Sequence, residues 1–355
     1  MPARYGRTLQ VAVLIVLSLP ISSLTLLLFG VSPYAGIVSL LENGFGSYQG
    51  LAATLTIVTP LLILAVGMSV PFTAKTWNIG GQGQYVIGSI LSTWIGLKLA
   101  GSFNVSVVLL VALIFGFIGG ALWAIPPTVM KLRFGTSEII TTFMMNFIAI
   151  YLLTYLISGP LQSPLAKVYN IPTSATIPAA DFLPKLLPGT DVTVGLLVGL
   201  VLAGLFYVVL NYSTFGYELK LIGDSQDAAR YAGVSIRRTI LIAMIISGGI
   251  SGIAGMVQIF GSSGALLPQS LSDITASFGY VSIPVALIAS LNPIAIVVSS
   301  VFFGGILHGG YALEQTYGVP IDVITTIFGI VMIFSLIGVT VDFAKVFRRQ
   351  KVVRS

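Results

Sequence analysis

Residues 281–308 read VSIPVALIASLNPIAIVVSSVFFGGILH, an apolar stretch that contains no Asp, Glu, Lys or Arg and is interrupted near its middle by Asn292-Pro293. A proline inside a helix removes a backbone hydrogen bond and clashes with the preceding turn. The stretch is therefore either one interrupted membrane crossing or a hairpin of two short helices. The choice decides on which side of the membrane the C-terminal part of the chain lies.

The whole chain has the composition of a membrane protein. Only 8% of its 355 residues are charged, 56% are hydrophobic, and the mean hydropathy is +1.01. An average soluble domain is about 25% charged, and a membrane helix needs about 20 apolar residues. Disorder is excluded, and the net charge of +6 indicates the cytoplasmic side of a bilayer rather than a nucleic-acid surface. Besides the 281–308 stretch we predict spans at 9–29, 51–71, 77–97, 105–128, 139–158, 192–211, 239–260 and 323–342.

The first span follows Arg4 and Arg7 and could also be read as a signal peptide. Its apolar run is longer than a typical signal-peptide core, and no A-x-A cleavage site follows it. We therefore predict a retained span that begins with a cytoplasmic N-terminus.

The distribution of Lys and Arg favours the hairpin. A single crossing by 281–308 would place nine of the 17 basic residues inside and eight outside. A hairpin places fourteen inside, five of them in the tail 343–355, and leaves only Lys98, Lys167 and Lys185 outside. The positive-inside rule selects the second arrangement, with both termini cytoplasmic. Each arm would then span about half a bilayer, which is tolerated only where protein or a water-filled cavity surrounds it.

An internal repeat supports the same arrangement. The sequence EIITT at 138–142 recurs as DVITT at 322–326, and F-x-G-G-x-L at 117–122 recurs at 302–307. The nearly equal offsets indicate a duplicated unit, and the predicted spans place the two copies in opposite orientations. We predict an all-α polytopic membrane protein of about ten transmembrane elements in two inverted five-element repeats, about 9–158 and 192–342, with 281–308 as a re-entrant pair. Such folds bind solute near the midplane.

The loop 213–238, predicted to be cytoplasmic, holds seven charged residues. Within it Ser225 offers an N-cap, 226–232 reads as a short helix, and Gly233 offers a C-cap. This helix is either a docking element for a partner or a solvated connector. The loop 160–191 is predicted to be extracellular, and its six prolines predict an extended surface segment.

The segment 77–84, WNIGGQGQ, combines three glycines with three amides. Each glycine weakens a helix by about 1 kcal/mol relative to alanine, and amides facing lipid would be costly. The segment therefore faces protein or a cavity, as a close helix contact or as the lining of a path for a neutral polar solute. The candidate path residues are Trp77, Asn78, Gln82, Gln84, Asn146 and Gln258.

Three motifs resemble those of ABC importer permeases, in the nucleoside and simple-sugar branch of the branched-chain amino acid/ribose-type family. They are D-A-A-x-x-x-G at 227–233, WNIGGQGQ at 77–84 and EIITTFMMN at 138–146. The similarity extends over about residues 44–340. The chain departs from many relatives at Gly81-Gln82, where they have Ala-Glu, and at Asp227, which replaces a Glu.

The resemblance implies the permease subunit of an ATP-driven importer that moves a neutral polar solute across the plasma membrane. Its partners would be two ABC ATPases, a second permease subunit, an extracellular substrate-binding lipoprotein and membrane lipid. The residues implied in ATPase coupling are Asp224, Asp227, Ala228, Ala229, Arg230, Tyr231 and Gly233.

No catalytic, cofactor or metal site is expected on the chain itself. It contains no G-x-x-x-x-G-K-[ST] motif, so ATP hydrolysis would reside on partner subunits. It also contains no cysteine and a single histidine. The alternative function is a secondary transporter, which can also use inverted repeats. Ion coupling commonly needs carboxylates within the membrane, whereas the acids here lie in loops or at helix ends.

Overall fold

The computed structural model describes residues 13–14, 17–169, 171–267 and 278–340. Within these ranges the chain is helical and has only two isolated β-bridges, which confirms the all-α prediction. Six helices are long and apolar enough to cross a membrane, so the chain is a multi-pass membrane protein. They are α3 (Tyr48–Thr73), α5 (Val105–Phe134), α6 (Glu138–Ile157), α8 (Gly195–Tyr212), α11 (Ile236–Gln258) with the π-helical turn η3 (Ile259–Ser263), and α14 (Pro293–Tyr317).

The N-terminal span was predicted at 9–29, partly outside the described residues. Its described part, Leu17–Phe29, ends in the 3-10 turn η1 (Leu24–Phe29), and Gly30 follows with a φ of 73°. The chain then bends by 113° into α2 (Pro33–Phe45). The sequence analysis missed α2, although Pro33 at its first turn is a helix-start signal.

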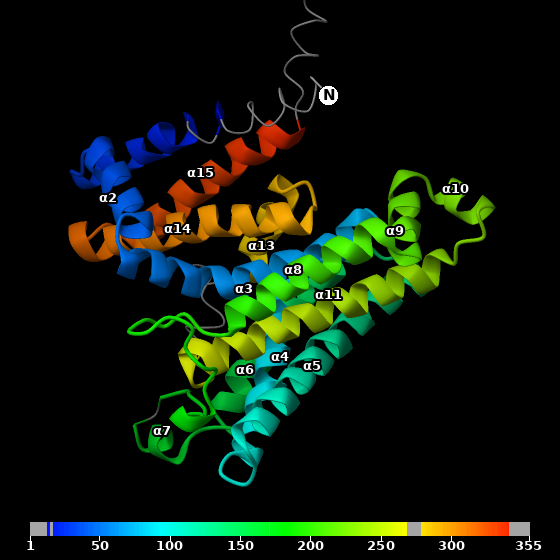
Figure 1. The fold of residues 1–355 in the computed structure, drawn as a ribbon, viewed down its shortest axis with the longest axis horizontal. Coiled ribbons are helices and arrows are strands. Elements are labelled where there is room, and N and C mark those ends of the chain that lie inside the picture. Colours follow the sequence, from blue (N-terminus) through cyan, green and yellow to red (C-terminus); the bar gives the residue numbers. More distant parts are fainter. Residues whose placement is uncertain (1–12, 15–16, 170, 268–277, 341–355) are drawn as a thin grey trace, which may run out of the picture. The chain divides into compact units, whose positions relative to one another are not determined.

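The chain divides into two compact units, 1–51 with 305–355 and 52–304. In the first unit Leu26, Val31, Val319 and Ile327 form a buried apolar cluster, which joins η1 to α15 (Ile321–Thr340). In the second unit, α9 (Thr214–Asp224) and α10 (Gln226–Tyr231) lie at one end, and α7 (Pro164–Val168) lies at the other (Figure 1).

The core of the second unit is formed by α5, α11 and α4 (Gly81–Leu99). Glycines allow these helices to approach at backbone distance, because a Cβ on Gly252 of α11 would overlap the carbonyl oxygen of Gly116 of α5. A Cβ on Gly88 of α4 would in turn overlap the Cα of Gly252. Lipid provides no hydrophobic drive between membrane helices, so small residues that allow close packing take its place.

Helix α4 begins at Gly81, later than the predicted span 77–97, because residues 76–79 are not helical. Its amides, glycines and serines lower its hydropathy, so it is not one of the six strongly apolar helices. Its side chains are nevertheless mostly buried against protein. It is a core helix with little lipid-facing surface.

The stretch 281–308 forms two helices, α13 (Phe278–Ile288) and α14, separated by residues 289–292. Ser290 and Leu291 have left-handed φ angles of 51° and 60°. The Oδ1 of Asn292 then accepts a hydrogen bond from the Ile294 amide at 3.0 Å and opens α14. The helix break therefore falls beside Asn292-Pro293.

The prediction that each arm spans half a bilayer is wrong for the second arm. Helix α14 has 25 residues, about 37 Å at 1.5 Å per residue, and is long enough to cross. Pro293 lies in its first turn, where the missing N–H costs no hydrogen bond. The proline therefore starts a full-length helix instead of limiting a short one.

The proposed repeats share local details at the ends of α5 and α14. Asn104 and Asn292 each accept a hydrogen bond from the amide two residues ahead, at 3.1 and 3.0 Å. Each helix ends before a left-handed glycine, Gly135 with a φ of 67° and Gly318 with a φ of 65°. The next helix has an acid in its first turn, and a threonine four residues later donates to the carbonyl oxygen of that acid. These pairs are Glu138 with Thr142 and Asp322 with Thr326.

The loop 213–238 contains the predicted helix, α10, with both predicted caps. The Ser225 hydroxyl accepts from the Ala228 amide at 3.2 Å, and Gly233 has a φ of 76°. The preceding helix α9 was not predicted. Its N-cap is Ser213, whose hydroxyl accepts from the Gly216 amide at 3.1 Å.

The loop 160–191 is more folded than the predicted extended segment. It contains α7 and the 3-10 turn η2 (Ala179–Asp181). Backbone amides of this loop donate to the carbonyl oxygens that follow α11: Ile177 to Gly264 at 2.7 Å and Leu183 to Phe260 at 2.8 Å. The loop therefore forms part of the end of the bundle.

Candidate functional site

The connection between α3 and α4 contains a short non-helical segment. After Thr73 the chain passes through Lys75, which has a left-handed φ of 51°, and residues 76–79 are not helical. The side chain of Asn78 replaces part of the missing backbone bonding. Its Oδ1 accepts from the Gly80 amide and from Gln84 Nε2, both at 3.1 Å, and its Nδ2 donates to Gln84 Oε1 at 3.0 Å.

Asn78 also reaches α11, since its Nδ2 lies 3.0 Å from the hydroxyl oxygen of Ser247. Gln82 joins the start of α4 to α13, because its Oε1 accepts from the Gly279 amide at 2.9 Å. The two side chains thus attach the α3–α4 connection to two different helices.

Asn146 of α6 contributes the remaining bonds. Its Oδ1 accepts from the Gly83 amide at 2.8 Å, and its Nδ2 donates to the Ile79 carbonyl at 2.9 Å and to the Tyr280 hydroxyl at 3.1 Å. The start of an α-helix has amides without partners inside the helix, and Asn146 satisfies one of them. We call Asn78, Gln82, Gln84 and Asn146 the amide clasp.

All four side chains of the amide clasp are at most 1% exposed. Each bonds protein groups, and an unpaired polar group at such a place would cost about 1–3 kcal/mol. In this conformation the clasp supports the non-helical backbone that the glycines permit. Direct contact of these amides with a solute stays a prediction.

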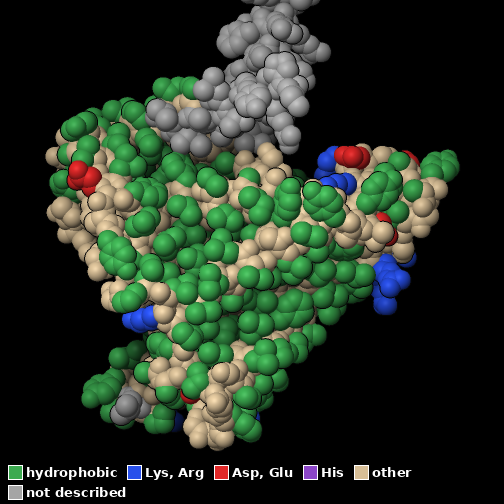
Figure 2. Space-filling model, viewed as in Figure 1, with side chains coloured by type: hydrophobic (Ala, Val, Ile, Leu, Met, Phe, Trp, Pro, Cys, Tyr) green, Lys and Arg blue, Asp and Glu red, His purple; other side chains and the backbone are tan. Residues whose placement is uncertain are grey.

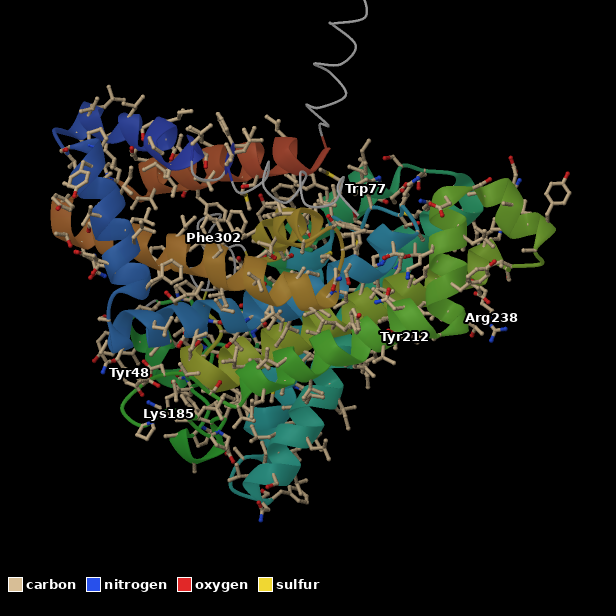
Figure 3. The ribbon with its side chains drawn as sticks, turned by 45° about the horizontal axis from the view of Figure 1, so that its top comes forward. Tyr48, Trp77, Lys185, Tyr212, Arg238 and Phe302 are labelled. Carbon is tan, nitrogen blue, oxygen red and sulfur yellow. The ribbon has the colours of Figure 1, made fainter. Side chains whose placement is uncertain are left out.

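The other two candidate path residues differ from the clasp. Trp77, labelled in Figure 3, is 37% exposed and directly precedes Asn78 in the chain. Its ring packs against that of Phe72, with centroids 5.0 Å apart and planes tilted by 54°. Gln258 lies three turns along α11 from Ser247 and bonds the Ser263 hydroxyl at 3.1 Å. It lines a small hollow together with Thr56, Thr193 and Asp191. The structure therefore separates Gln258 from the other five.

The sequence analysis missed a row of aromatic side chains on α6, which we call the aromatic stripe. It consists of Phe143, Phe147, Tyr151 and Tyr155, which are 37%, 41%, 72% and 65% exposed. The rings of Phe143 and Phe147 are 5.2 Å apart, and Phe143 is 6.1 Å from the ring of Tyr280. The spacing of four between these aromatic residues was visible in the sequence, and residues four apart are neighbours on the surface of a helix.

The α9–α10 end of the second unit carries the residues expected to couple to an ATPase. Figure 2 shows charged side chains gathered there, and Arg238 lies at the same end in Figure 3. Most of the expected residues are exposed, and Tyr231 is exposed by 95%. The exposed members of the set are Asp224, Asp227, Ala228, Arg230, Tyr231 and Gly233.

Ala229 does not fit this surface. It is fully buried within the chain itself, because α10 folds back on α9 and α11. Its carbonyl oxygen also accepts from the Val234 amide at 2.9 Å. A partner can reach Ala228 or Tyr231, whereas Ala229 holds α10 in place.

Helix α9 is fixed near its middle and near its end. At Glu218, the fifth of its eleven residues, Oε2 accepts from the Thr239 hydroxyl of α11 at 2.8 Å. Near the end, Gly223 lies against the last residue of α3, where a Cβ would overlap the carbonyl oxygen of Thr73. The loop 213–238 thus touches the backbone immediately before the α3–α4 connection.

The sequence profile of a transporter family, "Branched-chain amino acid transport system / permease component", matches residues 50–336. The chain is 29% identical to the guanosine ABC transporter permease protein NupP of Bacillus subtilis, over 94% of both chains. It is also 29% identical to the glucose ABC transporter permease protein TsgB13 of Haloferax volcanii, over 93% of this chain and 87% of that one. The nucleoside ABC transporter permease protein NupB of Lactococcus lactis is 26% identical over 90% and 88% of the two chains.

The profile covers the helices from α3 to most of α15 and includes the clasp, the stripe and the α9–α10 end. These comparisons favour the ABC permease over the secondary transporter. The chain therefore belongs to the branched-chain amino acid transport system permease family and is a permease component of an ABC transporter.

Proposed function

We propose that this permease belongs to an ATP-driven importer of a nucleoside or a simple sugar. The relatives named for guanosine, glucose and nucleosides support the substrate class. The structural observation behind it is the position of the charges. In the six apolar spans every charged side chain lies within four residues of a helix end. Such spans offer no buried cation to a phosphate or carboxylate and suit a neutral polar solute.

The proposed complex contains a second permease subunit, two ABC ATPases and an extracellular substrate-binding lipoprotein. ATP would bind the ATPases, and this chain would carry no cofactor. The ATPase would dock on the exposed surface of α10, of which Tyr231 is the most prominent side chain. Exposed aromatic residues frequently become the strongest contacts of an interface.

Uptake by the whole complex in liposomes tests the proposal. With the binding protein outside and ATP available to the ATPases, labelled guanosine or glucose should accumulate. Without ATP, accumulation should stop. Accumulation driven by a sodium or proton gradient in the absence of ATP would contradict the importer proposal.

We also propose that both termini are cytoplasmic and that the chain forms ten transmembrane elements in two inverted repeats. The shared ends of α5 and α14 support the repeat. Because α14 is long enough to cross completely, residues 289–292 are assigned to the cytoplasmic surface and residue 315 to the outside.

Single cysteines can test this topology because the native chain has none. Ser290→Cys should react only with reagent supplied from the cytoplasm. Gln315→Cys and Lys185→Cys should react from outside, since both side chains are exposed. Labelling of Ser290→Cys from outside would show that α14 does not cross in the assigned direction.

The coupling surface is tested with Tyr231→Ala. Loss of a central aromatic contact costs about 2 kcal/mol, so ATPase retention during co-purification should fall roughly tenfold or more. Substrate-stimulated ATP hydrolysis should fall with it. Tyr212→Ala is the matched control, since Tyr212 is 75% exposed but lies at the end of α8. Equal ATPase retention by the two variants would show that α10 is only a connector.

A further inference from the structure

The aromatic stripe differs from the other exposed faces of the second unit. Along the middle of α5 the large exposed side chains are aliphatic, and the same is true of α8. They are Leu110, Ile114, Ile118 and Leu122 on α5, and Leu197, Leu200, Val201, Leu205 and Val208 on α8. On α6 itself the neighbouring row, Ile140, Met144 and Ile148, is not aromatic either. Among the middle turns of α5, α6 and α8, exposed aromatic side chains thus occur only in this row of α6.

Contact with lipid does not explain the whole row, because it does not account for Tyr151. Membrane proteins place Trp and Tyr in belts at the two surfaces of the bilayer, as with Tyr212 at the end of α8. Tyr155, two residues before the end of α6, fits such a belt, and Phe147 is apolar enough to face lipid. Tyr151 lies six residues before the end, or about 9 Å at 1.5 Å per residue. A hydroxyl at that depth is costly unless it has a polar partner.

The row is also joined to the interior. Phe143 contacts the ring of Tyr280, and the Tyr280 hydroxyl accepts from the Asn146 amide. The Asn146 side chain, three residues after Phe143, is fully buried and holds the start of α4. The inner end of the stripe is therefore supported by the amide clasp, and its two outer members carry hydroxyl groups.

We propose that the aromatic stripe is the solute-facing wall of the permease and that it selects solutes with a flat aromatic base over plain sugars. This inference rests on the proposed function and names the substrate class more closely. Stacking of a base on an aromatic side chain contributes about 1–3 kcal/mol. Successive members of the stripe are about 6 Å apart along the helix axis. A base can therefore pass from one ring to the next without losing its stacking partner.

The hydroxyls of Tyr151 and Tyr155 suit the other half of such a solute. A phenol hydroxyl both donates and accepts hydrogen bonds, which matches the hydroxyls of a ribose. A neutral nucleoside would present its base to the rings and its sugar to these groups. A simple sugar would gain the hydrogen bonds without the base stacking.

The test uses the whole complex in liposomes and compares two solutes, guanosine and glucose. In Phe147→Leu and Tyr151→Leu the apparent KM for guanosine should rise roughly tenfold, and uptake of glucose should be unchanged. Phe147→Tyr keeps the ring and should retain the native KM. Met144→Leu and Ile148→Val, in the neighbouring row, are the matched controls and should behave as the native chain.

Three results would overturn the stripe proposal. An unchanged KM for guanosine in both leucine variants would show that the row faces lipid and not the solute. Loss of the second permease subunit on purification would make it a subunit interface. If the native complex takes up glucose but not guanosine, the proposed selection of aromatic bases is wrong, although the importer proposal still holds. If the native complex takes up neither solute with ATP, the proposed function itself fails before the variants are compared.

Discussion

Replacing Gly252 by valine should prevent the permease from accumulating as a folded protein. Gly252 lies where α11 meets both α5 and α4, and a Cβ there would overlap the carbonyl oxygen of Gly116. The overlapping atoms belong to helix backbone, so no side chain can rotate away. Overpacking of a core costs about 1–3 kcal/mol, and separation of three helices should exceed that range. Gel filtration of the detergent-solubilised protein should show loss of the monodisperse peak.

Gly204→Val in α8 is the matched control for this variant. It makes the same chemical change in a membrane helix, but no atom lies within 4 Å of the Cβ position. It should accumulate like the native protein. Similar yields and melting temperatures for the two variants would show that the glycine contacts can relax.

The second large effect is expected for Asn146→Leu. The change keeps the side-chain volume roughly constant but removes the partners of the Gly83 amide, the Ile79 carbonyl and the Tyr280 hydroxyl. An unsatisfied buried group costs about 1–3 kcal/mol, so three should destabilise the fold by more than about 3 kcal/mol. A markedly lower melting temperature in detergent should accompany loss of transport.

Two further variants distinguish the loss of clasp hydrogen bonds from the general effect on stability of removing an amide side chain. Asn211→Leu removes an exposed amide near the end of α8 and should melt like the native protein. Asn146→Asp keeps the acceptor for the Gly83 amide but loses both donated bonds, so its melting temperature should be intermediate. A native-like melting temperature for Asn146→Leu would mean that the clasp contributes little to stability.

The sequence predicted the long spans well because their signal is local. A charge-free apolar run of about 20 residues has few alternatives to a membrane helix. Helices α2 and α9 escaped because each is short and contains polar or charged residues. The length of α14 was also misjudged, since Pro293 was treated as the interruption of a helix when it is the beginning of one.

The site was predicted less completely, because its chemistry depends on tertiary contacts. The sequence picked out the amides of 77–84, but it could not show that Asn78 bonds Ser247, 169 residues away. It predicted α10 but not that Ala228 is exposed and Ala229 buried, since the packing of α10 on α9 and α11 decides that. The aromatic stripe was not predicted, because exposed and buried aromatic side chains cannot be told apart by their spacing alone.

The contact between Gly223 and Thr73 has a mechanical consequence. A displacement of α9 toward α3 would reach the carbonyl of Thr73 directly, because Gly223 has no side chain between the two backbones. Asn78 is five residues further along the chain, beyond the left-handed turn at Lys75. A displacement of Thr73 would therefore be transmitted through this turn to Asn78 and Gln82, whose side chains bond α4, α11 and α13.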